Sequence, residues 1–153
     1  MALLDISSDT ARLNFHPGQW RAWESQKRFV AVLSGTQGGK TSFGPLWLYR
    51  EIQQRGPGDY LIVTPTFTLL ELKALPEFRN YFETVLQLGR YVSSPSKSFT
   101  FSSNGALRTF GRKTDQPTRV LFGYAADPES LESATAKAAW LDEAGQKKFK
   151  LAS

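Results

Sequence analysis

The fold is indicated first by residues 34–41, which read Ser34-Gly35-Thr36-Gln37-Gly38-Gly39-Lys40-Thr41. They follow the apolar run 29–33, which predicts a buried parallel strand, and they open a helical pattern at 40–54. A strand, a glycine-rich turn and a helix in this order are typical of a phosphate-binding loop. Small residues let backbone N–H groups turn toward phosphate oxygens, and the helix N-terminus adds donors and a positive dipole end. We expect Lys40 to contact the β- and γ-phosphates and the Thr41 hydroxyl to bind Mg²⁺.

This loop departs from the common pattern GxxxxGK[ST] at its first position. Ser34 stands where that pattern has glycine, and Gly35 brings the first glycine one residue late. The alternative interpretation is a glycine-rich turn that happens to carry a lysine. The flanking strand and helix patterns favour the phosphate loop.

A pair of acids about a hundred residues downstream supports the same site. Residues 138–141 predict a second short buried strand, and Asp142 and Glu143 follow it directly. In ATPases with a phosphate loop, the first acid of such a pair holds Mg²⁺, and the second orients and deprotonates the attacking water. An acidic helix N-terminus is the alternative interpretation of the pair. Together with the loop, the pair predicts an ATP–Mg²⁺ site, with Thr41 and Asp142 on the metal and with Lys40 and Glu143 as catalytic groups.

Upstream, Gln19 lies in the stretch Phe15-His16-Pro17-Gly18-Gln19-Trp20. A glutamine amide offers one acceptor and one donor, which match the N6 and N7 edge of adenine. A helix start with buried aromatic residues is the alternative. The predicted nucleotide-binding residues are Gln19, Gly35, Thr36, Gln37, Gly38, Gly39, Lys40, Thr41 and Ser42.

The remaining chain alternates between strand and helix patterns. Strands are predicted at 60–63 and 119–124, helices at 19–27 and 67–88, and a short helix starts at 127–131. A β-hairpin is predicted at 98–110, around the turn Asn104-Gly105. Residues 1–14 suggest a polar lead-in with one short helix. The pattern predicts an α/β fold with a mostly parallel sheet flanked by helices.

Composition excludes several classes of function. The chain has 153 residues, which suits one domain, and no cysteine, which excludes disulfides and thiolate metal sites. His16 is the single histidine, so a histidine-rich metal site is excluded. No apolar run approaches the ~18 residues that a membrane helix needs, and residues 1–10 lack the features of a secretory signal. The net charge of +5 is compatible with a polyanion partner. We therefore expect an intracellular protein without a membrane segment.

Several of these motifs together resemble the large subunit of tailed-bacteriophage terminases. The likeness extends over about residues 15–146. The segment before the acidic strand and the late glycine in the loop are its more particular features. The motifs that carry it are Pro17-Gly18-Gln19-Trp20, the loop at 34–41, Leu61-Ile62-Val63-Thr64-Pro65-Thr66, Asp127-Pro128-Glu129-Ser130-Leu131-Glu132-Ser133 and Ala139-Trp140-Leu141-Asp142-Glu143-Ala144.

The resemblance implies a RecA-like P-loop NTPase that uses ATP and Mg²⁺ to drive double-stranded DNA into a viral prohead. It implies a homo-oligomeric ring, contacts with a portal protein and a small terminase subunit, and a place in the host cytoplasm at the prohead portal. Residues 1–153 would be the N-terminal part of the ATPase domain, a truncated unit without the nuclease domain of its relatives. In that truncated unit the strand at 138–141 could become an exposed edge of the sheet.

One departure from the family concerns catalysis. Many relatives carry an arginine inside the phosphate loop, where this chain has Thr36-Gln37. A cation must then come from elsewhere or from a neighbouring subunit. The candidates within this chain are Arg79, Arg108, Arg112 and Arg119.

Two other functions stay open at the level of sequence. The chain is alternatively the front half of a helicase-like DNA translocase. It is alternatively an inactive prophage remnant that binds a nucleotide without turning it over.

Overall fold

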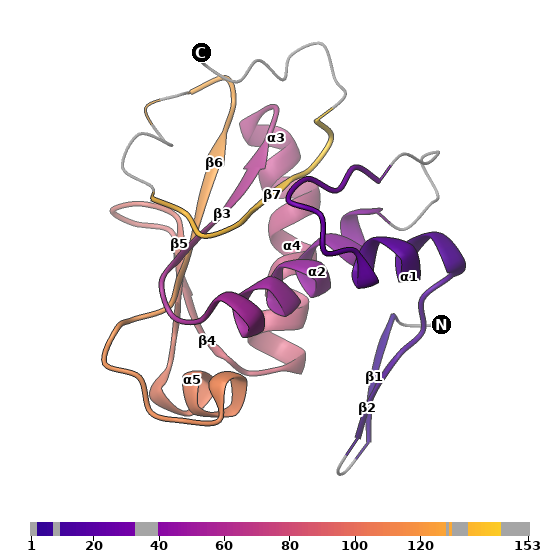
Figure 1. Ribbon diagram of the computed structural model, residues 1–153. Coiled ribbons are helices and arrows are strands. Elements are labelled where there is room, and N and C mark those ends of the chain that lie inside the picture. Colours follow the sequence, from indigo (N-terminus) through magenta and orange to yellow (C-terminus); the bar gives the residue numbers. More distant parts are fainter. Residues whose placement is uncertain (1–2, 8–9, 33–39, 128, 130–134, 145–153) are drawn as a thin grey trace.

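A computed structural model describes residues 3–7, 10–32, 40–127, 129 and 135–144. Within these ranges one mixed β-sheet has the strand order β4-β5-β6-β3-β7. A separate hairpin, β1-β2, extends away from the main body (Figure 1). The strands of the main sheet are β3 (Asp59–Thr64), β4 (Gly89–Val92), β5 (Ser98–Phe101), β6 (Arg119–Tyr124) and β7 (Ala139–Leu141).

Two helices precede the first strand of the main sheet in the chain, and the others lie between its strands. The helices are α1 (Pro17–Glu24), α2 (Lys40–Arg55) and α5 (Ser103–Phe110), together with a continuous helical run after β3. That run is divided into α3 (Phe67–Leu69), the π-helix η1 (Leu70–Ala74), α4 (Leu75–Arg79) and the π-helix η2 (Asn80–Val85). The predicted helix at 40–54 is therefore confirmed, and the helix predicted at 67–88 is confirmed over 67–85. The strands at 60–63, 119–124 and 138–141 are confirmed within one residue at each end.

The prediction of a mostly parallel, RecA-like sheet is wrong. β3 pairs in parallel with β6 on one side and with β7 on the other, but β4-β5 and β5-β6 are antiparallel pairs. The antiparallel pair β4-β5 arises because Gly89–Val92 forms a strand that the sequence interpretation missed. This strand returns as β5 through a serine- and proline-rich turn, and a direct turn of this kind can join only antiparallel strands.

The predicted β-hairpin at 98–110 is also wrong, because only its first half is a strand. Residues 103–110 form α5 instead, so Asn104-Gly105 belongs to a helix and not to a tight turn. The Ser102 hydroxyl caps this helix by accepting a hydrogen bond from the Gly105 N–H, and Gly111 ends it in a left-handed conformation at φ 70°. The buried positions 105, 106 and 109 have helical spacing. This spacing and the two caps outweigh the apparent alternation of apolar and polar residues.

Two predictions near the N-terminus differ from the structure as well. Residues 29–32 form no strand: Val30 and Val32 pack against the core, whereas Phe29 is 84% exposed. A short apolar run does not by itself provide a partner strand, and this one contacts the core with alternate side chains only. In place of a helix in the lead-in, β1 (Leu4–Ser7) and β2 (Thr10–Leu13) pair in antiparallel fashion, with Leu4 and Leu13 in register.

The helices cover one face of the sheet. Ile62, Phe122 and Trp140 are aligned on neighbouring strands, so their side chains share that face. The Phe78 ring of α4 contacts the Phe122 ring edge-on, with the centroids 5.0 Å apart, and stacks on the Phe82 ring at 4.1 Å. This packing holds the helical run and α2 against the strands from which the candidate site is built. Among the described residues, no helix combines the length and apolarity that crossing a membrane requires.

Candidate functional site

The first turn of α2 meets the end of β7, although the two segments lie far apart in the sequence. The Thr41 hydroxyl donates a hydrogen bond to the Asp142 carboxylate, with 3.4 Å between Oγ1 and Oδ2. The Asp142 N–H bonds to the Val63 carbonyl at 2.9 Å, which places the acid at the carboxyl end of β3. The structure thus brings together the two residues that the sequence predicted as Mg²⁺ ligands. Their role as ligands stays a prediction.

A glycine makes this meeting sterically feasible. A Cβ atom on Gly44 would lie 2.0 Å from Cε2 of the Trp140 indole ring, far inside contact distance. Trp140 is the central residue of β7 and is nearly buried. The backbone of α2 therefore lies directly on the indole ring, one turn after Thr41. Any larger residue at 44 would force the helix away from the strand that leads to Asp142.

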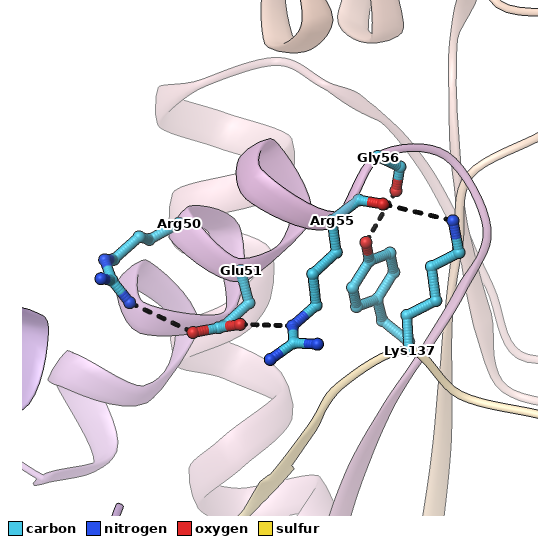
Figure 2. A network of polar contacts seen from close by, with 6 residues as sticks. Arg50, Glu51, Arg55, Gly56 and Lys137 are labelled. Atoms are coloured by element: carbon cyan, nitrogen blue, oxygen red, sulfur yellow. Dashed lines mark hydrogen bonds and ion pairs between the residues drawn. The ribbon is translucent and has the colours of Figure 1, made fainter. Parts of the chain in front are cut away.

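The far end of α2 is fixed to the same strands. Lys137, two residues before β7, donates from Nζ to the Arg55 carbonyl at 3.2 Å (Figure 2). The Tyr60 hydroxyl of β3 donates to the Gly56 carbonyl at 2.7 Å. Within α2, the Glu51 carboxylate accepts hydrogen bonds from both Arg50 and Arg55, as Figure 2 also shows. Both ends of the helix are thus attached, so its first turn has a defined position relative to β7.

Asp142 is a buried carboxyl group in an unfavourable electrostatic setting. Its side chain is 3% exposed. Burial raises its pKa above the ordinary value, and the neighbouring Glu143 charge raises it further. The Thr41 hydrogen bond and the positive charge of Lys73 act in the opposite direction but do not cancel the increase. A divalent cation would stabilise the charged form that burial disfavours.

This setting predicts how Asp142→Asn changes stability with pH. Because the folded pKa is raised, ionisation of Asp142 at neutral pH costs folding free energy, and that cost shrinks as pH falls below the folded pKa and vanishes below the unfolded pKa. In the absence of Mg²⁺ we expect Asp142→Asn to melt at a higher temperature than the parent at pH 7. The difference should shrink as the pH approaches the ordinary aspartate range. Thermal melts between pH 7 and pH 4 measure it, with the exposed Asp115→Asn as the matched control. A lower melting temperature for Asp142→Asn than for the parent at pH 7 would contradict the inference that ionised Asp142 destabilises the fold.

Glu143 has an unusual backbone conformation. Its φ is 57°, in the left-handed region that few residues other than glycine adopt. Such strain costs about 1–3 kcal/mol and is found preferentially at functional sites. The conformation follows directly after Asp142, so it sets the direction in which the chain leaves β7. Glu143 is the residue that the sequence predicted as the catalytic acid, a role that stays a prediction.

The oxygen ligands present fit Mg²⁺. The described residues contain no cluster of three or more His, Cys, Asp or Glu side chains suited to holding a metal ion. Mg²⁺ does not require one, because it retains waters and binds proteins through one or two carboxylates together with substrate phosphates. The Thr41 hydroxyl and the Asp142 carboxylate are the protein groups that a Mg²⁺ site completed by phosphate oxygens needs.

The glycine-rich loop lies outside the described residues, since Ser34, Gly35, Thr36, Gln37, Gly38 and Gly39 belong to the range 33–39. Lys40 is the first residue of α2, and its side chain also lies outside the description. Ser42 follows Thr41 in the first turn and is partly buried. The structure therefore describes the helix α2, which begins where the predicted phosphate loop ends.

Gln19 has a structural partner of its own. It lies in the first turn of α1 and is 2% exposed. Its amide oxygen accepts a hydrogen bond from the His16 N–H at 3.1 Å, while the His16 ring caps the helix in return. The neighbouring Phe15 ring packs among the rings of Trp20, Trp23 and Phe43. This is the helix start with buried aromatic residues that was the alternative interpretation, and the adenine contact of Gln19 stays a prediction.

Three of the four candidate arginines are bound elsewhere. Arg79 pairs with Glu83 at 2.7 Å, and Arg108 donates to the Leu86 and Gln87 carbonyls. Arg119 pairs with Asp59 at 2.8 Å, at the amino ends of β6 and β3 and thus at the opposite end of these strands from Asp142. Arg112 is exposed just after α5. None of them is among the groups whose charge acts on Asp142.

Sequence reasoning missed Lys73, the lysine of η1 whose charge acts on Asp142. No motif marks this position, because its nearness to the site depends on how the helical run after β3 folds back along the sheet. A lysine in the middle of an amphipathic helix is usually only a solvated charge.

Comparisons with protein families, with curated proteins and with solved structures found no significant match. The description of the junction between α2 and β7 therefore rests on the structure of this chain alone.

Proposed function

We propose that this chain binds ATP with Mg²⁺ at the junction of α2 and β7 and hydrolyses it. The observation that carries the proposal is the hydrogen bond between Thr41 and Asp142. The two residues are 101 positions apart in the sequence but are in contact in the fold. A hydroxyl at the start of a helix beside a buried carboxylate at a strand end is the arrangement that holds Mg²⁺ in phosphate-loop ATPases. The glycine-rich sequence directly before this helix supports the same conclusion.

In this proposal each group has a definite task. Thr41 and Asp142 would hold Mg²⁺, which would supply positive charge to the phosphate oxygens. Lys40 contributes a positive charge to the same phosphates. Glu143 orients a water molecule and accepts its proton as the water oxygen bonds to the γ-phosphorus. The bond from that phosphorus to the bridging oxygen breaks, and ADP leaves with the bonding electron pair on this oxygen.

The wider role that we propose is that of the ATPase motor of a viral terminase large subunit. The partners would be double-stranded DNA, a portal protein, a small terminase subunit and further copies of the chain in a ring. The place of action would be the prohead portal in the host cytoplasm. The support is the set of motifs at residues 15–146, together with the net charge of +5 that suits a polyanion.

Nucleotide binding with and without Mg²⁺ tests the proposed site. We expect Thr41→Ala to weaken MgATP binding by about tenfold or more, since removing even an indirect partner of a metal costs about 10–100-fold. In EDTA the variant and the parent should bind ATP equally weakly, because the hydroxyl then has no metal to hold. Titration calorimetry measures both affinities.

The matched control is Thr68→Ala, which removes an exposed hydroxyl in α3 and should bind MgATP like the parent. Two outcomes would overturn the proposal. One is a parent chain that binds no nucleotide. The other is a Thr41→Ala variant whose loss of affinity is the same with and without Mg²⁺.

A further inference from the structure

We propose that Lys73 supplies, in addition to Lys40, a second cation of the same chain that contacts the γ-phosphate of the bound nucleotide. This inference rests on the proposed nucleotide site and adds a residue to it. The phosphate loop of this chain carries Thr36-Gln37 and no arginine. Beside Lys40, a second positive charge from another part of the fold would stabilise the negative charge that develops during phosphoryl transfer.

The path of the chain brings the helical run that carries Lys73 to the edge of the sheet at which Asp142 lies. β3 ends at Thr64, and α3 begins at Phe67 after only two linking residues. Thr66 fixes this connection by capping α3, with the Leu69 N–H donating to its hydroxyl at 3.3 Å. The helical run therefore starts at the same sheet edge to which the Asp142 N–H is bonded, through the Val63 carbonyl.

From this edge the run passes back over β3 and β6, which η1 contacts directly. Lys73 lies in the second turn of the run, about 10 Å from its start at 1.5 Å per residue. Helical side chains lean toward the N-terminus of their helix, so the stem of Lys73 leans back toward the sheet edge. The positive charge of Lys73 lowers the pKa of the Asp142 carboxyl group, so the ammonium group lies close enough to act on it.

The helix turn that carries Lys73 has an unusual geometry. Residues 70–74 form a π-helix, and the Leu75 N–H bonds to the Leu70 carbonyl five residues back. π-turns of this kind are rare and recur at functional sites, because one extra residue per turn rotates the following side chains. Here Leu70 and Ala74 are buried in the core while Lys73 between them is exposed.

Lys73 also differs from its neighbours in how it is bonded. Lys97 pairs with Glu71 at 2.7 Å, and Lys137 bonds to the Arg55 carbonyl. Within the described residues, the Lys73 ammonium makes no direct ion pair with a carboxylate and is available for a further anion. An ammonium group whose charge reaches the Asp142 carboxylate without an ion pair to it suits the outer phosphate of a triphosphate.

A comparison of two nucleotides tests this role. The probes are ADP and the non-hydrolysable β,γ-imido analogue of ATP, each with Mg²⁺ and the full chain. We expect Lys73→Ala to weaken binding of the imido analogue about tenfold and to change ADP binding less than about twofold, because only the first ligand carries a γ-phosphate. Lys73→Arg should keep most of the preference for the triphosphate. Lys113→Ala, which removes an exposed lysine after α5, should bind both ligands like the parent.

The pattern of results separates the possible failures. An equal loss for both ligands in Lys73→Ala would overturn the proposal, since Lys73 would then act only through Asp142 and the metal. Unchanged binding of both ligands would overturn it as well. If the parent itself bound neither nucleotide, the proposed function would fail, and this inference with it. The melting temperature of Lys73→Ala should match that of the parent because the side chain is exposed.

Discussion

Glu143→Gln is expected to slow ATP hydrolysis by about 10²–10⁴-fold, the range that a positioned general base contributes. The amide has nearly the same shape as the carboxylate but cannot accept the proton of the attacking water. Binding of MgATP should change by less than about threefold, because the metal is held by Thr41 and Asp142. Single-turnover hydrolysis by the full chain, together with calorimetric binding of the imido analogue, separates the two effects.

The strained backbone of Glu143 gives this experiment a second readout. Glu143→Gln should keep the left-handed conformation at φ 57°, so its backbone strain should equal that of the parent. Glu143→Gly should also lose hydrolysis, yet it should be more stable by roughly 1 kcal/mol, since glycine adopts this φ without strain. Glu77→Gln, a change in α4, is the matched control for the loss of a carboxylate. Hydrolysis by Glu143→Gln at the parental rate would remove Glu143 from the role of base.

The local sequence pattern predicted the positions of the helix that carries Thr41 and of most strands beside it. Helix α2 and strands β3, β6 and β7 lie where their apolar runs and glycine boundaries indicated. The closeness of Thr41 and Asp142 was also predictable, because a phosphate loop and an acidic strand end occupy neighbouring places in such sites. These features depend on short-range chemistry that a single stretch of sequence carries.

Other features depend on contacts between segments that are distant in the sequence, so a local sequence pattern could not predict them. Residues 29–32 have a strand-like composition but no partner strand in the described part, and Gly89–Val92 is a strand because β5 returns beside it. Ser102 and Gly111 show why α5 replaced the expected hairpin: capping groups outweigh a short alternating pattern. Lys73 was missed because its nearness to Asp142 arises from the course of a helix over the sheet.

Gly44→Ala is the change with the largest expected effect on the structure. In an exposed helix interior this substitution would stabilise by about 1 kcal/mol through helix propensity. Here the added Cβ would lie 2.0–2.5 Å from three atoms of the Trp140 ring, so overpacking of roughly 1–3 kcal/mol or more opposes that gain. The ring is nearly buried between α2 and the sheet, which leaves it little room to move. We expect a net loss of about 2 kcal/mol, seen as a fall of about 4–8 °C in melting temperature.

The same substitution should damage the site, because α2 carries Thr41 one turn before Gly44. A helix displaced from β7 moves the hydroxyl away from Asp142, so MgATP binding should weaken by at least about tenfold. Gln53→Ala, an exposed change in α2, is the control for alanine in this helix. In a Trp140→Leu background, Gly44→Ala should become much less costly, since the smaller side chain leaves space for the Cβ. Strictly additive effects of the two substitutions would show that the contact between helix and indole does not hold α2 against the strand.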